Sequence, residues 1–375
     1  MRKVVLYNRR DFFSSPGIAN GMNGAFKNPE PVLYQEKNKT VNNVIVENAF
    51  ATLNDGMVIF IPFWRIETGK PGPSLMLLAS QHGNEIQGAE VARRFMEVCA
   101  RQLRTGSVWL LPMANLNAVQ KRRHSINLGP GDPVTKARVE DHNMNLIWPG
   151  KAEGNDTERI TYSLNHTLLR YCTHLVDIHC YNHFNAAETI AVNDNEPSFP
   201  MGEVTTTRFI TYNPTPNLQT ASQMIRRNGG GAIELELSGQ YQMQEKQVQT
   251  GLDSVINIAR VLGMLKGKPE LIGDRRAVRN SDTSHEIKAP CSGLFVPAAG
   301  KDKKSSLMPE DYVEKGQLLG HIINEQNLDE VPVIAPYSGY IWQLGACHTA
   351  RCDTSLPAQH PYSEEGERIA IIVSI

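Results

Sequence analysis

Residues 75–85 read LMLLASQHGNE, an apolar run that passes directly into a polar turn carrying His82 and Glu85. Consecutive apolar residues without alternation are typical of a buried parallel strand, although periodicity alone also allows a buried helix. The short run and the glycine after it favour the strand. Apolar residues then recur at three- and four-residue spacing, which predicts a helix; they are Ala89, Ala92, Met96, Cys99 and Leu103. We therefore expect His82 and Glu85 at the carboxyl end of a strand, where open α/β sheets build their sites.

The composition is that of an ordinary globular protein and excludes several classes of partner. A chain of 375 residues with 41% hydrophobic and 21% charged residues is long enough for two domains and a large core. Its 38 basic and 39 acidic side chains nearly cancel, so no overall field favours nucleic acid or an anionic membrane. We expect a small-molecule substrate and neither nucleic acid nor a membrane as partner.

The location expected from the sequence is cytoplasmic. Residues 1–16 are charged and contain no apolar segment typical of a signal peptide. No later run approaches the roughly 20 apolar residues needed to span a bilayer. Six cysteines scattered along the chain fit reduced, buried thiols better than a disulfide framework.

The chain divides into an arm and two predicted domains. Residues 1–40 are rich in Asn, Gly and Pro and predict an extended N-terminal arm. Residues 41–270 alternate strand candidates with amphipathic helices, which predicts an α/β fold with a mixed, mostly parallel sheet covered by helices on both faces. The strand candidates are 57–63, 75–80, 108–112, 174–179 and 232–237, and residues 252–265 predict a closing helix.

The region 285–375 predicts a small β-barrel domain after a linker. The segment Ala289-Pro290-Cys291-Ser292-Gly293-Leu294 recurs as Ala335-Pro336-Tyr337-Ser338-Gly339-Tyr340, and short strands with paired turns accompany this repeat. Neither repeated turn presents the lysine flanked by methionines of a biotinyl or lipoyl carrier. We expect the barrel to serve as a lid or as a contact in a homo-oligomer.

Two further strand ends supply candidate site residues. A histidine and a glutamate three residues apart, such as His82 and Glu85, can reach one zinc ion, and a catalytic zinc needs one more protein ligand. In the segment 175–179, alternation puts Asp177 and His179 on one face of a strand. We take His179 as the third ligand of one Zn²⁺ per chain, although the residues alone do not distinguish zinc from another divalent ion. Asp177 is either a carboxylate that orients an imidazole or an ordinary strand-end residue.

A general acid and base is expected on the strand 232–237. Its two glutamates, Glu234 and Glu236, lie two residues apart before Ser238-Gly239. The water that a zinc ion activates needs a base to take its proton and an acid to return that proton to the leaving amine, and one glutamate with a raised pKa can do both. We assign this role to Glu236, which is nearest the strand end, with Glu234 in reserve.

These segments together resemble the succinylglutamate desuccinylase and aspartoacylase family, whose fold is similar to zinc carboxypeptidases. The resemblance covers residues 50–265, and the predicted barrel is similar to the family's appended domain. The motifs that carry it are His82-Gly83-Asn84-Glu85, Asp177-Ile178-His179, Glu236-Leu237-Ser238-Gly239 and Asn143-Met144-Asn145-Leu146-Ile147-Trp148-Pro149-Gly150.

The resemblance implies an arginine that polarises the scissile carbonyl, a role in which a fixed guanidinium stabilises the developing oxyanion. Arg123 is the best match, with Arg122 and Arg138 as alternatives, and Asn145 joins it in positioning the substrate. One departure stands out, because the family typically has an arginine after this asparagine and the chain has Leu146. Leucine cannot form a bidentate ion pair. Either another cation such as Arg138 binds the substrate, or the substrate lacks a carboxylate there.

The function expected from the residues and the resemblance is that of a zinc-dependent amidohydrolase, a deacylase that removes an N-acyl group from a small amino acid or amine. A metallocarboxypeptidase acting on short peptides is the nearest alternative, and the missing arginine argues against it because peptide trimming usually needs a carboxylate clamp. A non-catalytic metal-binding or regulatory protein is the alternative from another class.

Overall fold

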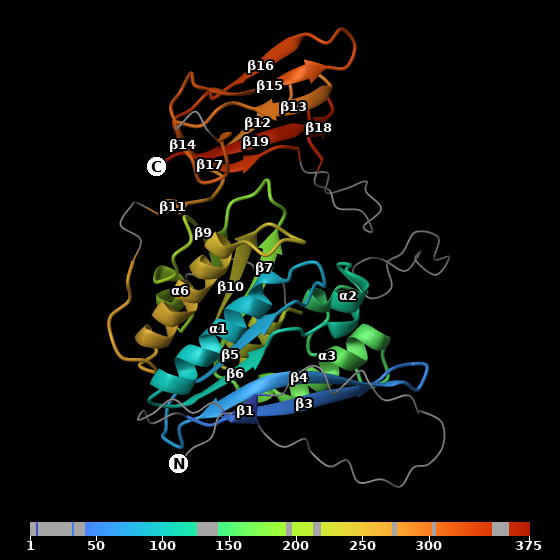
Figure 1. Cartoon of the computed structure of the whole chain (residues 1–375), viewed down its shortest axis with the longest axis vertical. Helices are drawn as coiled ribbons and strands as arrows, with labels where there is room; N and C mark the ends of the chain where they lie inside the picture. The colour runs from blue at the N-terminus through green and yellow to red at the C-terminus, as the bar shows by residue number, and fades with distance from the viewer. Residues whose placement is uncertain are drawn as a thin grey trace.

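A nine-stranded mixed sheet forms the centre of the larger unit (Figure 1). The computed structural model describes residues 42–125, 142–192, 197–212, 219–271, 276–301, 305–346 and 360–375, and the backbone of the antiparallel strands β1 (Val5–Leu6) and β2 (Val32–Leu33). The strand order of the large sheet is β11-β9-β8-β10-β7-β5-β6-β4-β3. The strands are β3 (Val44–Thr52), β4 (Val58–Glu67), β5 (Ser74–Ala79), β6 (Ser107–Leu111), β7 (His174–Tyr181), β8 (Glu188–Ala191), β9 (Phe209–Tyr212), β10 (Gly231–Ser238) and β11 (Ala277–Val278).

Most neighbouring strands of this sheet run parallel, as the sequence predicts. The central strand β5 pairs parallel with β6 and β7, and β7 pairs parallel with β10. At the flanks, β9 is parallel to β8 and β11, whereas β4 is antiparallel to β3 and β6, and β8 is antiparallel to β10. The carboxyl ends of β5, β7 and β10 therefore meet at one edge of the sheet.

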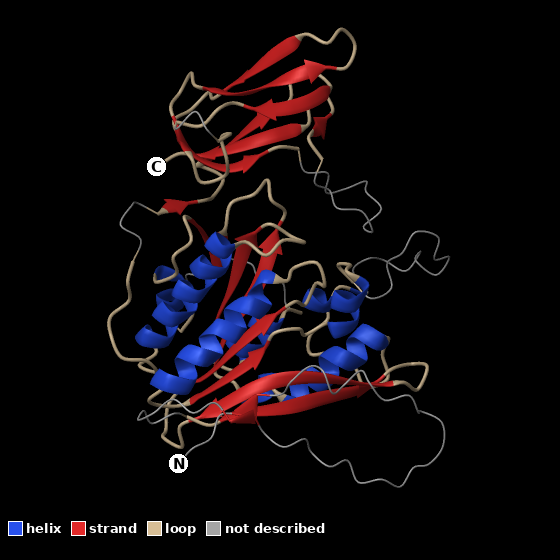
Figure 2. Ribbon diagram, viewed as in Figure 1, coloured by secondary structure: helices blue, strands red, loops and turns tan. Residues whose placement is uncertain are grey.

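Helices cover both faces of the sheet (Figure 2). On β5, Leu75, Leu77 and Ala79 pack toward α1 and α6, whereas Met76 and Leu78 pack toward α2, α3 and α5. All five side chains are fully buried, and replacing one such core leucine by alanine typically costs about 2–5 kcal/mol. The helices are α1 (Gln87–Gln102), α2 (Leu116–Lys121), η3 (Met144–Leu146), α3 (Asp156–Thr167), η4 (Leu169–Tyr171), α4 (Phe199–Glu203), α5 (Ala221–Arg227) and α6 (Glu245–Val261).

The strands that follow form two smaller sheets rather than one closed sheet. Their orders are β12-β19-β17-β14 and β16-β15-β13-β18. Side chains from both sheets, including Phe295, Ile322 and Ile372, share one core, so the predicted β-rich unit is present but a closed barrel is not confirmed. The strands are β12 (Ser284–Lys288), β13 (Gly293–Pro297), β14 (Tyr312–Val313), β15 (Leu318–Asn324), β16 (Glu330–Ile334), β17 (Gly339–Leu344), β18 (Tyr362–Ser363) and β19 (Arg368–Val373).

Some predicted bounds differ from the structure. The closing helix, expected at 252–265, spans Glu245–Val261 and so begins seven residues earlier. Its first turn, Glu245-Lys246-Gln247, is polar and carries no apolar periodicity from which to predict it. The strands β3, β8, β9 and β11 were not predicted. Within the described ranges, no helix is both long and apolar enough to cross a membrane.

Candidate metal centre

A tight turn after β5 fixes the segment that carries His82 and Glu85. The chain leaves the strand through Ser80, whose φ of 54° is uncommon for a residue with a side chain. The backbone N–H of Asn115 donates to the Ser80 carbonyl at 3.0 Å, and the Ser80 hydroxyl donates to the Glu85 carbonyl at 3.0 Å. These two bonds hold the turn in place. The segment that carries His82 and Glu85 is therefore fixed at the carboxyl end of β5.

Gly83 is needed because the turn lies directly against helix α2. A Cβ atom at this position would lie 2.1 Å from the carbonyl carbon of Ala118, which is far closer than atoms of two residues can approach. The Gly83 N–H also donates to the carbonyl of His124 at 3.2 Å. The glycine of the His-Gly-Asn-Glu motif thus sets the distance between the turn and the segment after α2.

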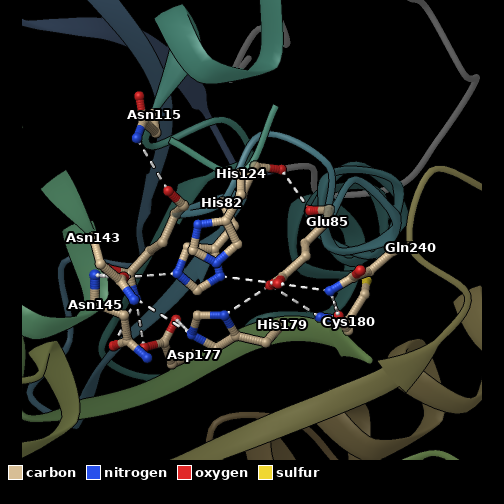
Figure 3. Close-up of polar contacts among 12 residues, drawn as sticks. His82, Glu85, Asn115, His124, Asn143, Asn145, Asp177, His179, Cys180 and Gln240 are labelled. Atoms are coloured by element: carbon tan, nitrogen blue, oxygen red, sulfur yellow. Dashed lines mark hydrogen bonds and ion pairs between the residues drawn. The ribbon is translucent and has the colours of Figure 1, made fainter. Parts of the chain in front are cut away.

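Three of the predicted residues meet at this edge of the sheet (Figure 3). His82, Glu85 and His179 are all buried and each offers one ligand atom, and these atoms lie within 4.8 Å of one another. Nδ1 of His82 lies 2.9 Å from one Glu85 carboxylate oxygen, and Nδ1 of His179 lies 2.9 Å from the other. The residues predicted as metal ligands from three separate motif positions therefore form one cluster that could hold a metal ion.

The far side of each imidazole has its own partner. Nε2 of His82 lies 2.8 Å from Oδ1 of Asn143, which also accepts the backbone N–H of Asn145 at 3.0 Å and is therefore an acceptor. Nε2 of His179 lies 3.3 Å from Oδ1 of Asp177. Nε2 of His82 thus faces an acceptor and Nε2 of His179 faces a carboxylate, whereas both Nδ1 atoms face Glu85, the side on which a metal ion would lie. The structure brings Asp177 to the place expected for an orienting carboxylate.

Gln81 links the turn to the surrounding elements. Its Nε2 donates to Oδ2 of Asp177 at 2.7 Å and to Oδ1 of Asn145 at 3.3 Å. Its Oε1 accepts from Nε1 of Trp148 at 2.7 Å. The Asn143–Gly150 motif is therefore joined to the cluster through hydrogen bonds of both asparagines, and Gln81 is a site residue that the sequence analysis missed.

The electrostatics of the cluster match its geometry. Burial alone would raise the pKa of Glu85, but the two neighbouring histidines outweigh this effect and hold the pKa well below its ordinary range. Burial alone would lower the pKa of His179, but Asp177 and Glu85 raise it well above its ordinary value. A positive charge between these groups is therefore favoured, and a bound cation would supply it.

Glu236 lies beside the cluster on the neighbouring strand. It is in register with His179 in the parallel pair of β10 and β7, and Glu234 is in register with Asp177. Paired residues of adjacent strands point to the same face, so both glutamates face the side on which the cluster lies. Burial raises the pKa of Glu236 well above its ordinary range, and the nearby negative charge of Glu85 adds to this effect. A carboxyl group in this state can both take up and release a proton near neutral pH.

The segment after α2 brings His124 onto the ligand cluster. The ring of His124 stacks on that of His82, with centroids 3.8 Å apart and an angle of 18° between the planes. Burial, assisted by the positive charge of His82, lowers the pKa of His124 to about 3, so its imidazole is neutral at physiological pH. Nothing in the pattern Lys121-Arg122-Arg123-His124 distinguished the histidine from its basic neighbours. Arg123 lies one residue earlier, and its predicted role stays a prediction.

Of the remaining residues singled out in the sequence, two lie in the part of the chain that the structure describes and one does not. Asn145 lies on η3 and is bonded to Gln81. Arg138 lies outside the described residues. Leu146 follows Asn145 and is half-buried.

The ligand atoms of the cluster are of the kinds that zinc prefers. Two imidazole nitrogens and one carboxylate are a donor set typical of catalytic zinc, which leaves further coordination positions open. The amide oxygen of Asn143 and the carboxylate of Asp177, which face the Nε2 atoms, are partners of the kind that metal-ligating histidines usually have. Both the donor atoms and their supporting contacts are therefore present in this chain.

The comparison with known families agrees with this site. The model of the succinylglutamate desuccinylase/aspartoacylase catalytic domain matches residues 71–262, slightly more than half of the chain. The chain belongs to this family. The match includes the three cluster residues and Glu236, and it confirms the resemblance inferred from the motifs. Among curated protein sequences no relative matches the chain.

Several solved structures share the fold. An aspartoacylase family protein from Mesorhizobium loti superposes with a TM-score of 0.65 at 20% identity, covering 88% of this chain and 94% of that one. A succinylglutamate desuccinylase/aspartoacylase from Rhodobacter sphaeroides gives a TM-score of 0.63 at 19% identity, covering 88% of this chain and 95% of that one. The ectoine utilization protein EutE from Ruegeria pomeroyi, with product bound, gives a TM-score of 0.65 at 18% identity, covering 88% of this chain and 95% of that one. Because the coverage reaches 88%, the similarity of fold extends beyond the catalytic domain.

Replacing Asn143 with alanine is expected to weaken metal binding while leaving the fold intact. The substitution removes the acceptor for Nε2–H of His82, and partners of this kind typically contribute a factor of about 10 to 100 in metal affinity. Competition with a chromophoric chelator measures the change. The exposed Asn327, whose amide lies at a surface turn, provides the control Asn327→Ala. Equal affinities for the two variants would contradict the orienting role of Asn143.

Proposed function

We propose that the protein is a zinc-dependent amidohydrolase that removes an N-acyl group from a small amino acid or amine in the cytoplasm. Family membership supports a deacylase-type hydrolase acting on amide bonds. The observation that carries the metal assignment is the cluster of His82, Glu85 and His179, in which both Nδ1 atoms face one carboxylate. Two histidines and one carboxylate with open positions favour zinc over the harder cations.

Each residue of the site has a definite task in this proposal. His82, Glu85 and His179 hold the zinc ion, which would supply a Lewis acid that lowers the pKa of water and polarises the scissile carbonyl. Glu236 accepts the proton of the attacking water and passes it to the leaving amine, and its raised pKa suits both steps. Asn145 contacts the substrate from η3, and Arg123 stabilises the developing oxyanion.

The substrate side of the proposal depends on Leu146. Since this position holds no guanidinium, an N-acyl substrate without a carboxylate at this position is accommodated as well as one that has it. Arg138 is the candidate cation if a carboxylate is required. A carboxypeptidase activity is less favoured for the same reason.

Metal content and hydrolysis of a substrate panel test the proposal. We expect about one zinc ion per chain by mass spectrometry, loss of turnover after chelation, and recovery on adding zinc. The panel contains N-acetyl and N-succinyl derivatives of amino acids and of amines, with His82→Ala as the control that should hold no metal. Cleavage of the amine derivatives would show that no carboxylate is needed. Bound zinc without turnover on any member would contradict the enzyme and favour the non-catalytic alternative.

A further inference from the structure

A second glutamate lies opposite Glu236 on the other neighbouring strand. Glu188 of β8 is in direct antiparallel register with Glu236 of β10. Side chains of directly opposed residues in such a pair share one face, and like charges at these positions destabilise the sheet. Glu188 is fully buried. Its negative charge therefore needs a partner that holds it away from Glu236.

Arg279 is that partner. Its Nε and Nη2 lie 2.7 and 2.9 Å from the two carboxylate oxygens of Glu188, a bidentate ion pair. The hydroxyls of Thr211 and Tyr181 also donate to the same carboxylate. Leaving such a buried carboxylate without its cation is strongly unfavourable, whereas the intact pair is tolerated.

The small β-rich unit holds Arg279 in this position. The guanidinium carbon of Arg279 lies 4.2 Å from the ring centroid of Trp342 on β17, and Tyr181 meets the same ring edge-on at 5.6 Å. The backbone fixes the register, because the Ala186 N–H donates to the Trp342 carbonyl at 2.8 Å. In the figure, β17 lies beyond the carboxyl ends of β7 and β10 (Figure 1). Trp342 is thus tied to the loop that joins β7, which carries His179, to β8.

We infer that Glu188 and Arg279 are positioning residues for Glu236, and that Trp342 of the small β-rich unit completes this arrangement. The inference rests on the proposed role of Glu236. In this arrangement the small unit is a fixed part of the site, because its aromatic ring and its backbone both hold groups beside the strand ends. The lid or homo-oligomer contact expected from the sequence stays a prediction.

Kinetics of a charge-balanced pair of variants test the inference. Arg279→Met should lower kcat about ten-fold or more, with KM within about three-fold and the metal content unchanged, because Glu188 is left unpaired opposite Glu236. The double variant Glu188→Gln/Arg279→Met contains no unpaired charge and should recover most of the loss. Normal kcat in Arg279→Met, or a double variant as slow as the single one, would overturn the inference.

A stability cycle decides the question without any substrate. The fall in Tm caused by Arg279→Met is measured in the wild type and in Glu236→Gln. The cycle is run at alkaline pH, where the raised pKa of Glu236 no longer keeps its carboxyl neutral. If Glu188 acts on Glu236, the fall should be smaller by about 2 °C or more in the Glu236→Gln background, because one of the two facing charges is gone. Equal falls would mean that Arg279 is only structural. Absence of turnover in the wild type would instead count against the proposed function, and this cycle would still be decisive.

A matched control distinguishes a specific effect of Trp342 on kcat from a general effect of contact between the two units. Arg208 stacks on Tyr340 of the same strand at 4.5 Å, an equivalent pair that does not involve Glu188. Trp342→Leu should lower kcat several-fold while Tyr340→Leu leaves it within about two-fold. Trp342→Phe, which keeps an aromatic face, should be close to the wild type. Equal losses for the two leucine variants would contradict a special role of Trp342.

Discussion

Replacing Glu236 with glutamine should leave the metal and the fold in place and lower kcat by about 10²- to 10⁴-fold. This range is what a positioned general acid and base usually contributes. Glutamine keeps the size of the side chain but can neither accept the proton of water nor return it to the amine. Zinc content by mass spectrometry and steady-state kinetics on the best substrate of the panel measure the two quantities.

Glu234→Gln is the matched control for this prediction. Glu234 lies on the same strand and the same face, opposite Asp177, and burial likewise raises its pKa. Because it lies two residues further from the strand end than Glu236, its replacement should leave kcat within about ten-fold of the wild type. A large loss in Glu234→Gln together with a small one in Glu236→Gln would transfer the acid and base role to Glu234.

Stability of the metal-free protein gives an independent view of Glu236. Its folded pKa is raised above that of the unfolded chain, so its contribution to stability is fully present below the ordinary glutamate pKa of about 4.3 and is lost as the pH rises through the folded value. Glutamine does not ionise. The metal-free Glu236→Gln variant should therefore lose less stability than the wild type as the pH rises through this interval.

The sequence predicted those parts of the fold whose local pattern agrees with their burial. Strand β5 is covered by helices on both faces, so its run of apolar residues is uninterrupted and readily identified. Strand β8 is short, and one of its four residues is the buried Glu188, whose ion-pair partner Arg279 lies far along the chain. No local pattern reveals such a strand, because its burial depends on a partner from another segment.

The same distinction explains the site. His82, Glu85, His179 and Glu236 follow or end strands whose carboxyl ends meet, so topology alone brings them together. His124 and Gln81 join the site through a ring stack and hydrogen bonds to residues distant in the sequence. Helix α2 ends at Arg122 in the left-handed conformation just before His124, a backbone detail that residue type did not reveal.

Replacing His179 with alanine should abolish stable zinc binding and, with it, all measurable turnover. The substitution removes one of three protein ligands and also leaves Asp177 and Glu85, both buried, without the imidazole that lies between them. We expect less than about one tenth of the wild-type metal content after dialysis. His166→Ala is the control, because this histidine is exposed on α3 and bonds only the carbonyl of Tyr162 among the described contacts.

The pH dependence of metal binding to the wild-type protein should identify His179 as a ligand. Since the pKa of His179 is raised well above its ordinary value in the metal-free protein, its imidazole is protonated at neutral pH and must release a proton when the metal binds. Affinity should therefore fall about ten-fold for each unit by which the pH drops below that raised pKa. Chelator competition across this interval, with proton release followed by calorimetry, measures the effect. An affinity independent of pH near neutrality would show that His179 carries no proton to displace, and would remove it from the ligand set if His179→Ala also retained zinc.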